Sequence, residues 1–183
     1  ELMWLTAWAG VAVCNGIQRC CGVRPGIKWT NDLIVEGRKV CGILTELGME
    51  GESAEPQYVV VGVGVNVRQT EADFGPQVAP VAISLGQILG SAPRLADLAA
   101  CILTALDDLR AAFPLQKERY LAQYRSDCVT LGREVRLVGP QGERSAVAEA
   151  IDEDFQLVVR LPGGGHETVH AGEVSVRGML GYV

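Results

Sequence analysis

The residues best suited to chemistry lie between positions 28 and 66. The run KWTND brings Lys28, Asn31 and Asp32 close together, and a second lysine, Lys39, follows a Glu-Gly-Arg turn. A lysine beside a carboxylate can compensate negative charge on a phosphate or on another carboxylate. These residues therefore indicate a site for an anion or a nucleotide.

Ordinary structural explanations apply to the same residues. Lysines at strand ends are usually solvated, and an Asn-Asp pair is typical of a turn. Residues 31 and 32 are followed at once by the apolar run 33–35, so the pair lies within an element. Polar groups there need hydrogen-bond partners, from the protein or from a ligand, and residue types alone leave both interpretations open.

Gly62 and Gly64, in the run VVGVGVNV, resemble the start of a dinucleotide-binding fingerprint. That fingerprint requires a third glycine, where Val67 stands, and a helix that begins immediately. The interpretation fails on both points. What remains is a strand whose glycines let a ligand or another backbone approach closely, with Asn66 at its end. A purely structural reason for the two glycines stays open.

Two other kinds of catalytic site are excluded by the remaining residues. His166 and His170 lie far along the chain from any candidate nucleophile, so no Ser-His-Asp or Cys-His set can be assembled. The six cysteines form no Cys-x-x-Cys pair and have no histidine nearby, which argues against a zinc site. We interpret them as reduced, mostly buried thiols of a cytosolic protein.

The elements that position these residues follow from hydropathy patterns. Apolar residues at helical spacing over 2–17 predict a buried helix, and 27–48 predicts two strands around a tight turn at 36–38. The β-branched run 57–67 predicts a buried strand in a sheet covered by helices. A polar loop and an irregular stretch are expected at 51–56 and 68–80.

The second half of the chain changes character near residue 128. One helix is predicted from Leu95 until Pro114 ends it, and a second follows to about Ser126. Beyond it, short strands parted by Pro, Gly and Asp turns predict a small β-barrel. The predicted fold class is α+β, a mixed sheet with flanking helices followed by this barrel.

Composition and charge limit the possible partners. The chain has 183 residues, 48% of them hydrophobic, which suits one substantial domain with a small satellite. Its net charge of −6 and its scattered basic residues do not form the basic stripe that nucleic-acid binding requires. The apolar opening segment is interrupted by polar residues and lacks a preceding basic region, so we expect neither a signal peptide nor a membrane span.

Residues 28–32, 38–46 and 62–66 read KWTND, RKVCGILTE and GVGVN. In this order they resemble the K-W-P-N-D, R-K-x-x-G-I-L-x-E and G-x-G-x-N motifs of the biotin protein ligase family, whose members attach biotin to biotin-dependent carboxylases. Residues 170–178, HAGEVSVRG, are similar to the G-E-[VI]-S-x-R that closes the family's SH3-like C-terminal domain.

The resemblance implies a partial catalytic domain of class II aminoacyl-tRNA synthetase-like fold over 1–127 and an SH3-like domain over 128–183. It implies a cytoplasmic ligase that works in two steps. Biotin and ATP, with Mg²⁺, form biotinyl-5′-AMP and release pyrophosphate. A lysine of a biotin carboxyl carrier domain, from acetyl-CoA carboxylase or a related carboxylase, then attacks the anhydride. A homodimer is compatible with the resemblance.

The same resemblance implies roles for individual residues. Lys39 matches the lysine that contacts both the carboxylate and the phosphate, and it would act as an electrostatic anchor. Asn31 and Asp32 match residues near the nucleotide and the attacking carrier lysine. Backbone groups at three glycines would reach the biotin ring and the adenylate: Gly42, Gly62 and Gly64. Asn66 would lie near phosphates or metal, Lys28 would support nucleotide binding, and Trp29 would pack behind the site.

Two departures from the family pattern matter. Thr30 stands where the family usually has Pro, and the family's G-R-G-R-x-G-[RS] loop and Ser-Thr-Asn segment do not occur in the chain. We therefore expect an incomplete form that lacks part of the site. A non-catalytic biotin- or nucleotide-binding fragment, whose C-terminal module serves interactions, stays open as an alternative. A lipoate or octanoyl transferase is disfavoured because those enzymes lack the R-K-x-x-G-I-L run.

Overall fold

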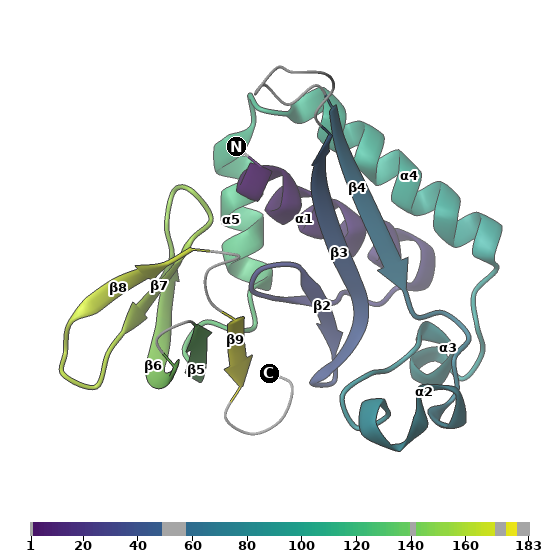
Figure 1. Cartoon of the computed structure of the whole chain (residues 1–183). Coiled ribbons are helices and arrows are strands. Elements are labelled where there is room, and N and C mark those ends of the chain that lie inside the picture. The colour runs from purple at the N-terminus through teal and green to yellow at the C-terminus, as the bar shows by residue number, and fades with distance from the viewer. Residues whose placement is uncertain (1, 49–57, 140–141, 171–174, 179–183) are drawn as a thin grey trace.

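The computed structural model describes residues 2–48, 58–139, 142–170 and 175–178. Within these residues the chain forms two antiparallel sheets and five helices, which confirms the α+β class (Figure 1). Some predicted features lie outside the described residues: the polar loop 51–56, the turn residues 140–141 and part of the closing motif, 171–174.

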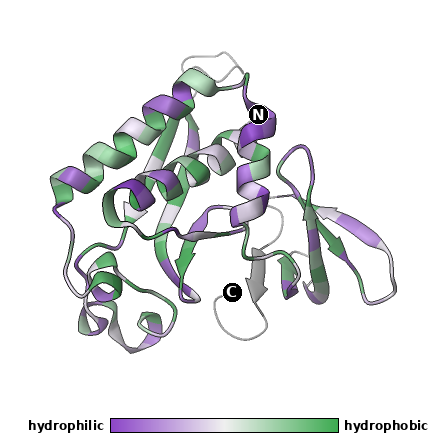
Figure 2. Ribbon diagram, turned by 180° about the vertical axis from the view of Figure 1, so that it is seen from behind, coloured by the Kyte–Doolittle hydropathy of each residue, from purple (hydrophilic) through white to green (hydrophobic). Residues whose placement is uncertain are grey.

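The first sheet has helices on one face. Its strands lie side by side in chain order: β1 (Gly26–Lys28), β2 (Asp32–Val35), β3 (Arg38–Gly48) and β4 (Tyr58–Val65). Three longer helices accompany it: α1 (Leu2–Cys21), α4 (Leu95–Ala112) and α5 (Lys117–Asp127). Helices α1 and α4 pack on each other, and α1 contacts β3, so the view from behind shows them across the sheet (Figure 2).

Helix α1 is the centre of the core, as the sequence predicts. Its residues between Ala7 and Ile17 are buried with the single exception of Asn15, which explains the absence of charge there. Trp8 stacks on Tyr120 of α5 with ring centroids 4.1 Å apart, and it meets Phe113 edge-on at 5.1 Å. Among the described residues, no helix is long and apolar enough to cross a bilayer.

The prediction of a mixed sheet is wrong. Both sheets are antiparallel, and parallel pairing among the described residues is confined to two isolated bridges, Ile27 with Cys128 and Lys39 with Ala82. For strands that follow each other in the chain the connections are short, whereas parallel strands need a long crossover; β5 and β9, which are far apart in the chain, are antiparallel as well. The hairpin between β2 and β3 is confirmed. Its turn residues 36 and 37 both have positive φ, 52° and 74°, as a type I′ turn requires.

Strand β4 exists as predicted, but it is not buried. It forms an edge of the sheet, and Tyr58 and Val60 are 53% and 48% exposed on its open face. Only the other face, with Val61, Val63 and Val65, packs against the core. A β-branched run therefore indicated a strand without indicating how many of its faces are covered.

The stretch expected to be irregular contains helical turns. Two short helices lie in it and after it: α2 (Glu71–Val78) and α3 (Leu85–Leu89). Each begins with a capping box, Thr70 with Asp73 and Ser84 with Gln87. Gly75, at φ 72°, interrupts α2. The Gly and Pro content suggested a loop, whereas the two capping patterns were the signal for helix starts.

The second sheet follows α5 and has the strand order β8-β7-β6-β5-β9. Its strands are β5 (Glu134–Gly139), β6 (Gly142–Ile151), β7 (Leu157–Arg160), β8 (His166–Val169) and β9 (Ser175–Gly178). The predicted short strands are confirmed, although the last predicted strand is divided into β8 and β9. In the described residues the sheet is open, with β8 and β9 at its two edges, so closure into an SH3-like barrel stays a prediction.

One ion pair joins the loop after α1 to the end of α5. The Arg24 guanidinium donates to both carboxylate oxygens of Asp127, with an Nε–Oδ1 distance of 2.9 Å, and it also donates to Asn15 and Gln18 of α1. The hydrogen bonds to the Asp127 carboxylate raise the pKa of Arg24. Because the Asp127 side chain is only 8% exposed, the pair is largely desolvated and fixes the chain where the second sheet begins.

Arg24→Ala is expected to lower the free energy of unfolding by about 3 kcal/mol, because the Asp127 carboxylate would stay buried without its counter-charge. Urea denaturation measures the difference. The matched control is Arg94→Ala, since the Arg94–Asp97 pair is exposed and should contribute less than about 0.5 kcal/mol. An equal loss of unfolding free energy in the two variants would show that the Arg24–Asp127 pair contributes no more than an exposed ion pair.

Candidate functional site

An open cleft of about 420 Å³ lies on the face of the first sheet that the helices leave uncovered. Six of the predicted site residues line it: Asn31, Asp32, Lys39, Gly42, Gly62 and Gly64. Strand pairing explains why they meet, since Asp32 pairs with Gly42 and Gly42 pairs with Gly64. The other two predicted residues, Lys28 and Asn66, are not part of this lining within the described chain.

A β-bulge in β3 determines which way Lys39 points. Two consecutive residues of β2 pair with Cys41 and Lys39, so Val40 is an extra residue between them. In a regular strand, Lys39 and Gly42 would face opposite sides of the sheet. The extra residue turns Lys39 onto the open face, where its Nζ lies 2.9 Å from the position that a Gly42 Cβ would occupy.

The backbone of Lys39 is also held from the side opposite β2. Its N–H donates to the Val81 carbonyl at 2.8 Å, and its carbonyl accepts from the Ile83 N–H at 2.9 Å. The Asn66 side chain donates a further hydrogen bond, at 3.1 Å, to the same carbonyl. The Lys39 side chain therefore extends from a backbone that is held on both sides, which limits the directions that the side chain can take.

Lys39 and Asp32 form an ion pair inside the cleft. Lys39 Nζ lies 2.5 Å from Asp32 Oδ1, and the side chains are 36% and 17% exposed. A lysine ammonium has three N–H donors, so it can hold Asp32 and an anionic ligand together. The arrangement provides a positive charge at a fixed position, with a carboxylate beside it.

The three glycines of the cleft are glycines for different reasons. A Cβ on Gly42 would meet the Lys39 Nζ at 2.9 Å and its Cε at 3.0 Å, so a side chain there would displace the lysine. A Cβ on Gly62 or Gly64 would meet nothing closer than 3.7 Å. Packing does not require those two glycines. Because they have no side chain, the backbone at the base of the cleft is uncovered, and a flat ligand can approach it.

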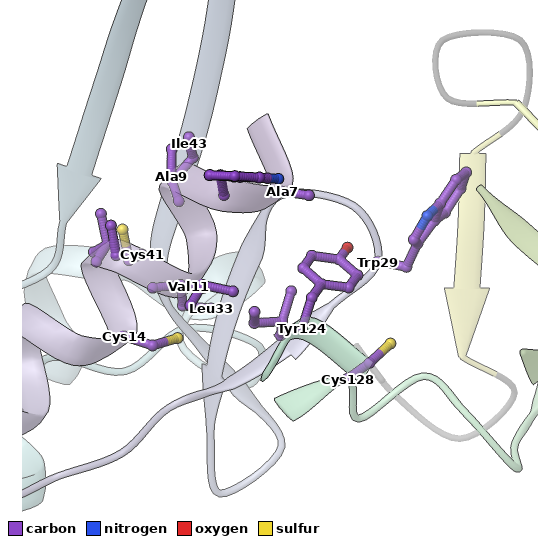
Figure 3. Packing of buried hydrophobic residues seen from close by; sticks show 14 of the residues in the cluster. Ala7, Ala9, Val11, Cys14, Trp29, Leu33, Cys41, Ile43, Tyr124 and Cys128 are labelled. Atoms are coloured by element: carbon purple, nitrogen blue, oxygen red, sulfur yellow. The ribbon is translucent and has the colours of Figure 1, made fainter. Parts of the chain in front are cut away.

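Asn31 connects the turn before β2 to β3. Its side-chain Nδ2 donates to the Ile43 backbone carbonyl at 2.6 Å, and its backbone carbonyl accepts from the Ile43 N–H at 3.0 Å. The predicted need for hydrogen-bond partners is thus met partly within the protein. Trp29, two residues earlier, is buried in the hydrophobic core (Figure 3), as expected of a packing residue and not of a ligand contact. The peptide bond between Trp29 and Thr30 is cis.

Asn66 and Lys28 lie outside the cleft. The Asn66 amide donates to the carbonyls of Lys39 and Ile83, at 3.1 and 3.3 Å, so it supports the Lys39 backbone from behind. Lys28 is buried at the end of β1. Their predicted contacts with the nucleotide, with phosphates or with metal stay predictions.

The sequence interpretation missed the apolar part of the lining. Leu44 is 59% exposed on the open face, and Ile43 and Val63 also line the cleft, although their side chains face the core. The signal was the period of two along β3, which places Leu44 on the same face as Gly42. The cleft thus combines an apolar edge with one fixed charge pair, as ligand sites commonly do.

Cys41 lies directly behind the cleft, but its thiol is not a nucleophile. Burial raises its pKa to about 12, an effect that Lys39 opposes and Asp32 reinforces. His166 pairs with Glu149 at 2.8 Å in the second sheet. All six cysteines are unpaired, and no cluster of His, Cys, Asp and Glu in the described ranges is suited to a metal ion.

Gly42→Ala is expected to push Lys39 away from Asp32, because the new methyl group would contact the ammonium. A crystal structure of the variant should show the Nζ–Oδ1 distance beyond about 4 Å, the usual limit of an ion pair. Gly62→Ala is the control, since its methyl group has room and should leave the pair intact. An unchanged Lys39–Asp32 contact in Gly42→Ala would show that the site does not depend on this glycine.

Cys41 should resist alkylation in the folded protein. At about pH 8 a thiol with so high a pKa carries almost no thiolate, and burial blocks access. Mass spectrometry after iodoacetamide treatment should find Cys41 unmodified and the half-buried Cys21 modified. In urea both should react. Equal labelling of the two cysteines in the folded protein would show that Cys41 is neither buried nor protonated as described.

Two family profiles match separate parts of the chain. The profile described as "Biotin/lipoate A/B protein ligase family" matches residues 2–66, which contain the whole cleft. The profile described as "Biotin protein ligase C terminal domain" matches residues 130–177, which form the second sheet.

Curated relatives carry related names. A "Biotin--[acetyl-CoA-carboxylase] ligase" of Paracoccus denitrificans is 31% identical over 175 residues, covering 91% of this chain and 70% of the relative. The Mycobacterium tuberculosis protein of the same name is 33% identical over 93% of this chain, and the match covers 61% of that protein. The "Bifunctional ligase/repressor BirA" of Bacillus subtilis is 42% identical over 86 residues, which are 47% of this chain and only 26% of that protein.

Solved structures of the biotin protein ligase from Aquifex aeolicus share the fold. The apo structure superposes with a TM-score of 0.85 at 22% identity, covering 97% of this chain and 76% of that one. The structure of its complex with biotin and ATP superposes with a TM-score of 0.83 at 24% identity, covering 97% and 72%. With the Paracoccus relative matched over most of both chains, this chain belongs to the biotin protein ligase family.

Proposed function

We propose that the chain carries the adenylate-forming cleft of a biotin–[acetyl-CoA-carboxylase] ligase. Such an enzyme activates biotin with ATP as biotinyl-5′-AMP and transfers biotin to a lysine of a carboxyl carrier domain. The observation that carries the proposal is the Lys39 ammonium, fixed beside Asp32 above a glycine floor. The names of the relatives and the ligands of the Aquifex complex support it.

The shape of the cleft suits the two proposed substrates. The bare backbone at Gly62 and Gly64 gives a flat surface whose N–H and C=O groups can meet a ring ureido group or an adenylate. Leu44, which is exposed on the same face, offers apolar contact beside it. Biotin combines an apolar bicycle and chain with a carboxylate, so one end matches the apolar edge and the other matches Lys39.

The first proposed step brings a carboxylate against a phosphate. Two anions repel unless a fixed cation lies between them, and a preorganised cation is most effective where charge develops in the transition state. Lys39 would occupy that position, with its direction fixed by the bulge at Val40. Its part is electrostatic, since the ammonium holds both anions and transfers no proton.

The second proposed step needs a neutral amine on the carrier lysine. Asp32 Oδ1 lies beside the proposed reaction centre, where its carboxylate would orient that amine or accept its proton. Asn31 would position the nucleotide from the turn before β2. When the carrier lysine approaches, Asp32 must exchange part of its contact with Lys39 for the incoming ammonium or amine.

The remaining features of the proposal concern partners and organisation. Mg²⁺ would enter with the ATP phosphates, since Mg²⁺ is usually bound through substrate phosphates and one or two carboxylates. We propose a catalytic unit over 1–127 and an SH3-like unit over 128–183, a cytoplasmic location, and a homodimer as a possible assembly. The chain spans 26% to 70% of the relatives named above, so the activity is proposed for the protein that contains it.

Lys39→Ala is expected to lower the rate of biotinyl-AMP formation by a factor of about 10² to 10³, the usual effect of losing one preorganised charge contact. The assay measures pyrophosphate release from biotin and ATP, in a form that spans the full length of the relatives.

Lys117→Ala is the matched control, because Lys117 lies over the Trp4 ring and beside Asp154, away from the cleft. Both variants should keep the wild-type circular dichroism. Undiminished adenylate formation in Lys39→Ala would refute the assignment. Retained biotin binding without turnover in the parent protein would favour the non-catalytic alternative.

A further inference from the structure

The two residues before Asn31 are held by parts of the chain outside the first sheet. The Trp29 backbone N–H donates to Thr130 Oγ1 at 2.9 Å, and its indole Nε1–H donates to the Phe155 carbonyl at 2.9 Å. The Tyr124 hydroxyl of α5 donates to the Thr30 carbonyl at 2.9 Å. Figure 3 shows the Tyr124 ring with its hydroxyl directed toward the segment that carries Trp29.

Burial makes each of these hydrogen bonds consequential. Trp29, Tyr124, Thr130 and Phe155 are all buried, so a partner that is lost cannot be replaced easily by water. The contacts also join the two regions matched by the family profiles, since Trp29 lies in 2–66, and Thr130 and Phe155 lie in 130–177.

The acceptor at Phe155 is itself fixed. Phe155 has a φ of 61°, an uncommon value outside glycine, within a turn closed by the hydrogen bond from the Asp152 N–H to the Gln156 carbonyl. The Asp152 carboxylate accepts from the backbone N–H groups of Asp154 and Gln156, at 2.9 and 2.8 Å. Tyr124 meets the Phe155 ring edge-on at 5.6 Å, which ties α5 to the same turn.

The position of Trp29 and Thr30 determines where the next two residues, Asn31 and Asp32, lie in the cleft. Asn31 follows in the chain and exchanges two hydrogen bonds with Ile43 of β3, and Asp32 comes next and pairs with Lys39. A displacement of the turn would therefore move the amide and the carboxylate relative to the ammonium, and displacements of this kind reduce rates strongly.

We propose that Thr130 and Phe155 of the C-terminal unit, together with Tyr124 of α5, form a positioning device for the cleft, which acts through Trp29 and Thr30. Thr130, the Phe155 carbonyl and Tyr124 are positioning groups: they hold the 29–30 peptide so that Asn31 and Asp32 face Lys39. The catalytic consequence rests on the proposed function, whereas the structural consequence does not. The C-terminal unit thus contributes to the reaction without lining the cleft.

Two nearly isosteric variants test the proposal in the chain itself. Tyr124→Phe removes the donor to Thr30, and Thr130→Val removes the acceptor of the Trp29 N–H. Tyr120→Phe is the matched control, since Tyr120 is buried on the same helix but stacks on Trp8. Thermal unfolding first establishes that all three variants fold.

Amide hydrogen exchange, followed by NMR, provides a readout that does not depend on activity. The Ile43 amide donates to Asn31, and the Ile83 amide, which donates to Lys39, serves as internal reference. In Tyr124→Phe and in Thr130→Val, exchange at Ile43 should accelerate about tenfold relative to Ile83, as loss of one buried hydrogen bond predicts. Tyr120→Phe should change neither. If Ile43 accelerates no more than Ile83 in either variant, the proposal is overturned.

The catalytic arm uses the same variants in the adenylate assay. Thr130→Val, in the C-terminal unit, and Tyr124→Phe should each lower kcat about tenfold with little change in KM for biotin, because orientation and not binding is disturbed. Tyr120→Phe should retain kcat. A kcat of Thr130→Val equal to that of Tyr120→Phe would overturn the catalytic part of the inference. Full activity of Lys39→Ala would instead refute the proposed function and leave the exchange result standing.

Discussion

The site depends on one unpaired residue in a strand. Val40 has no partner in β2, and because it is inserted there, Lys39 projects onto the open face of the sheet. The contact with Asp32 and the need for glycine at position 42 follow from that direction, and Asn66 supports the Lys39 backbone from which the side chain extends. A bulge of this kind interrupts the alternation of side chains along the strand and places a charged side chain on the same face as the uncovered glycine backbone.

Much of the cleft was predictable because its residues are close in the chain or in register. Asp32 and Gly42 belong to one hairpin, and Gly64 pairs with Gly42 from the next strand. A short connection makes such neighbours antiparallel, and the motifs marked which of them carry chemistry. The predicted mixed sheet was wrong because the β-branched run was interpreted as a buried strand of a sheet covered by helices, whereas the short connections already favoured antiparallel hairpins.

Other properties were not predictable from residue types. The burial of β4 depends on which of its faces a helix covers, and Val60 and Val61 differ in environment although they are identical in type. Asn66 is similar to a ligand-binding asparagine in its motif, but its amide is used by two backbone carbonyls. Residue identity states which hydrogen bonds are possible, and only the fold determines which partner is near enough to make them.

The hydrogen bonds of Trp29 join parts of the chain that are far apart in sequence. Trp29 and Phe155 are separated by 126 positions, and Arg24 and Asp127 by 103. Contacts of such long range close late, because the entropy of a large loop must be overcome first. On the ribosome, the hairpin that carries Lys39 can form early, but the turn beside it lacks its anchor until the residues around Phe155 have emerged. The proposed catalytic geometry would therefore be among the last features of this chain to mature.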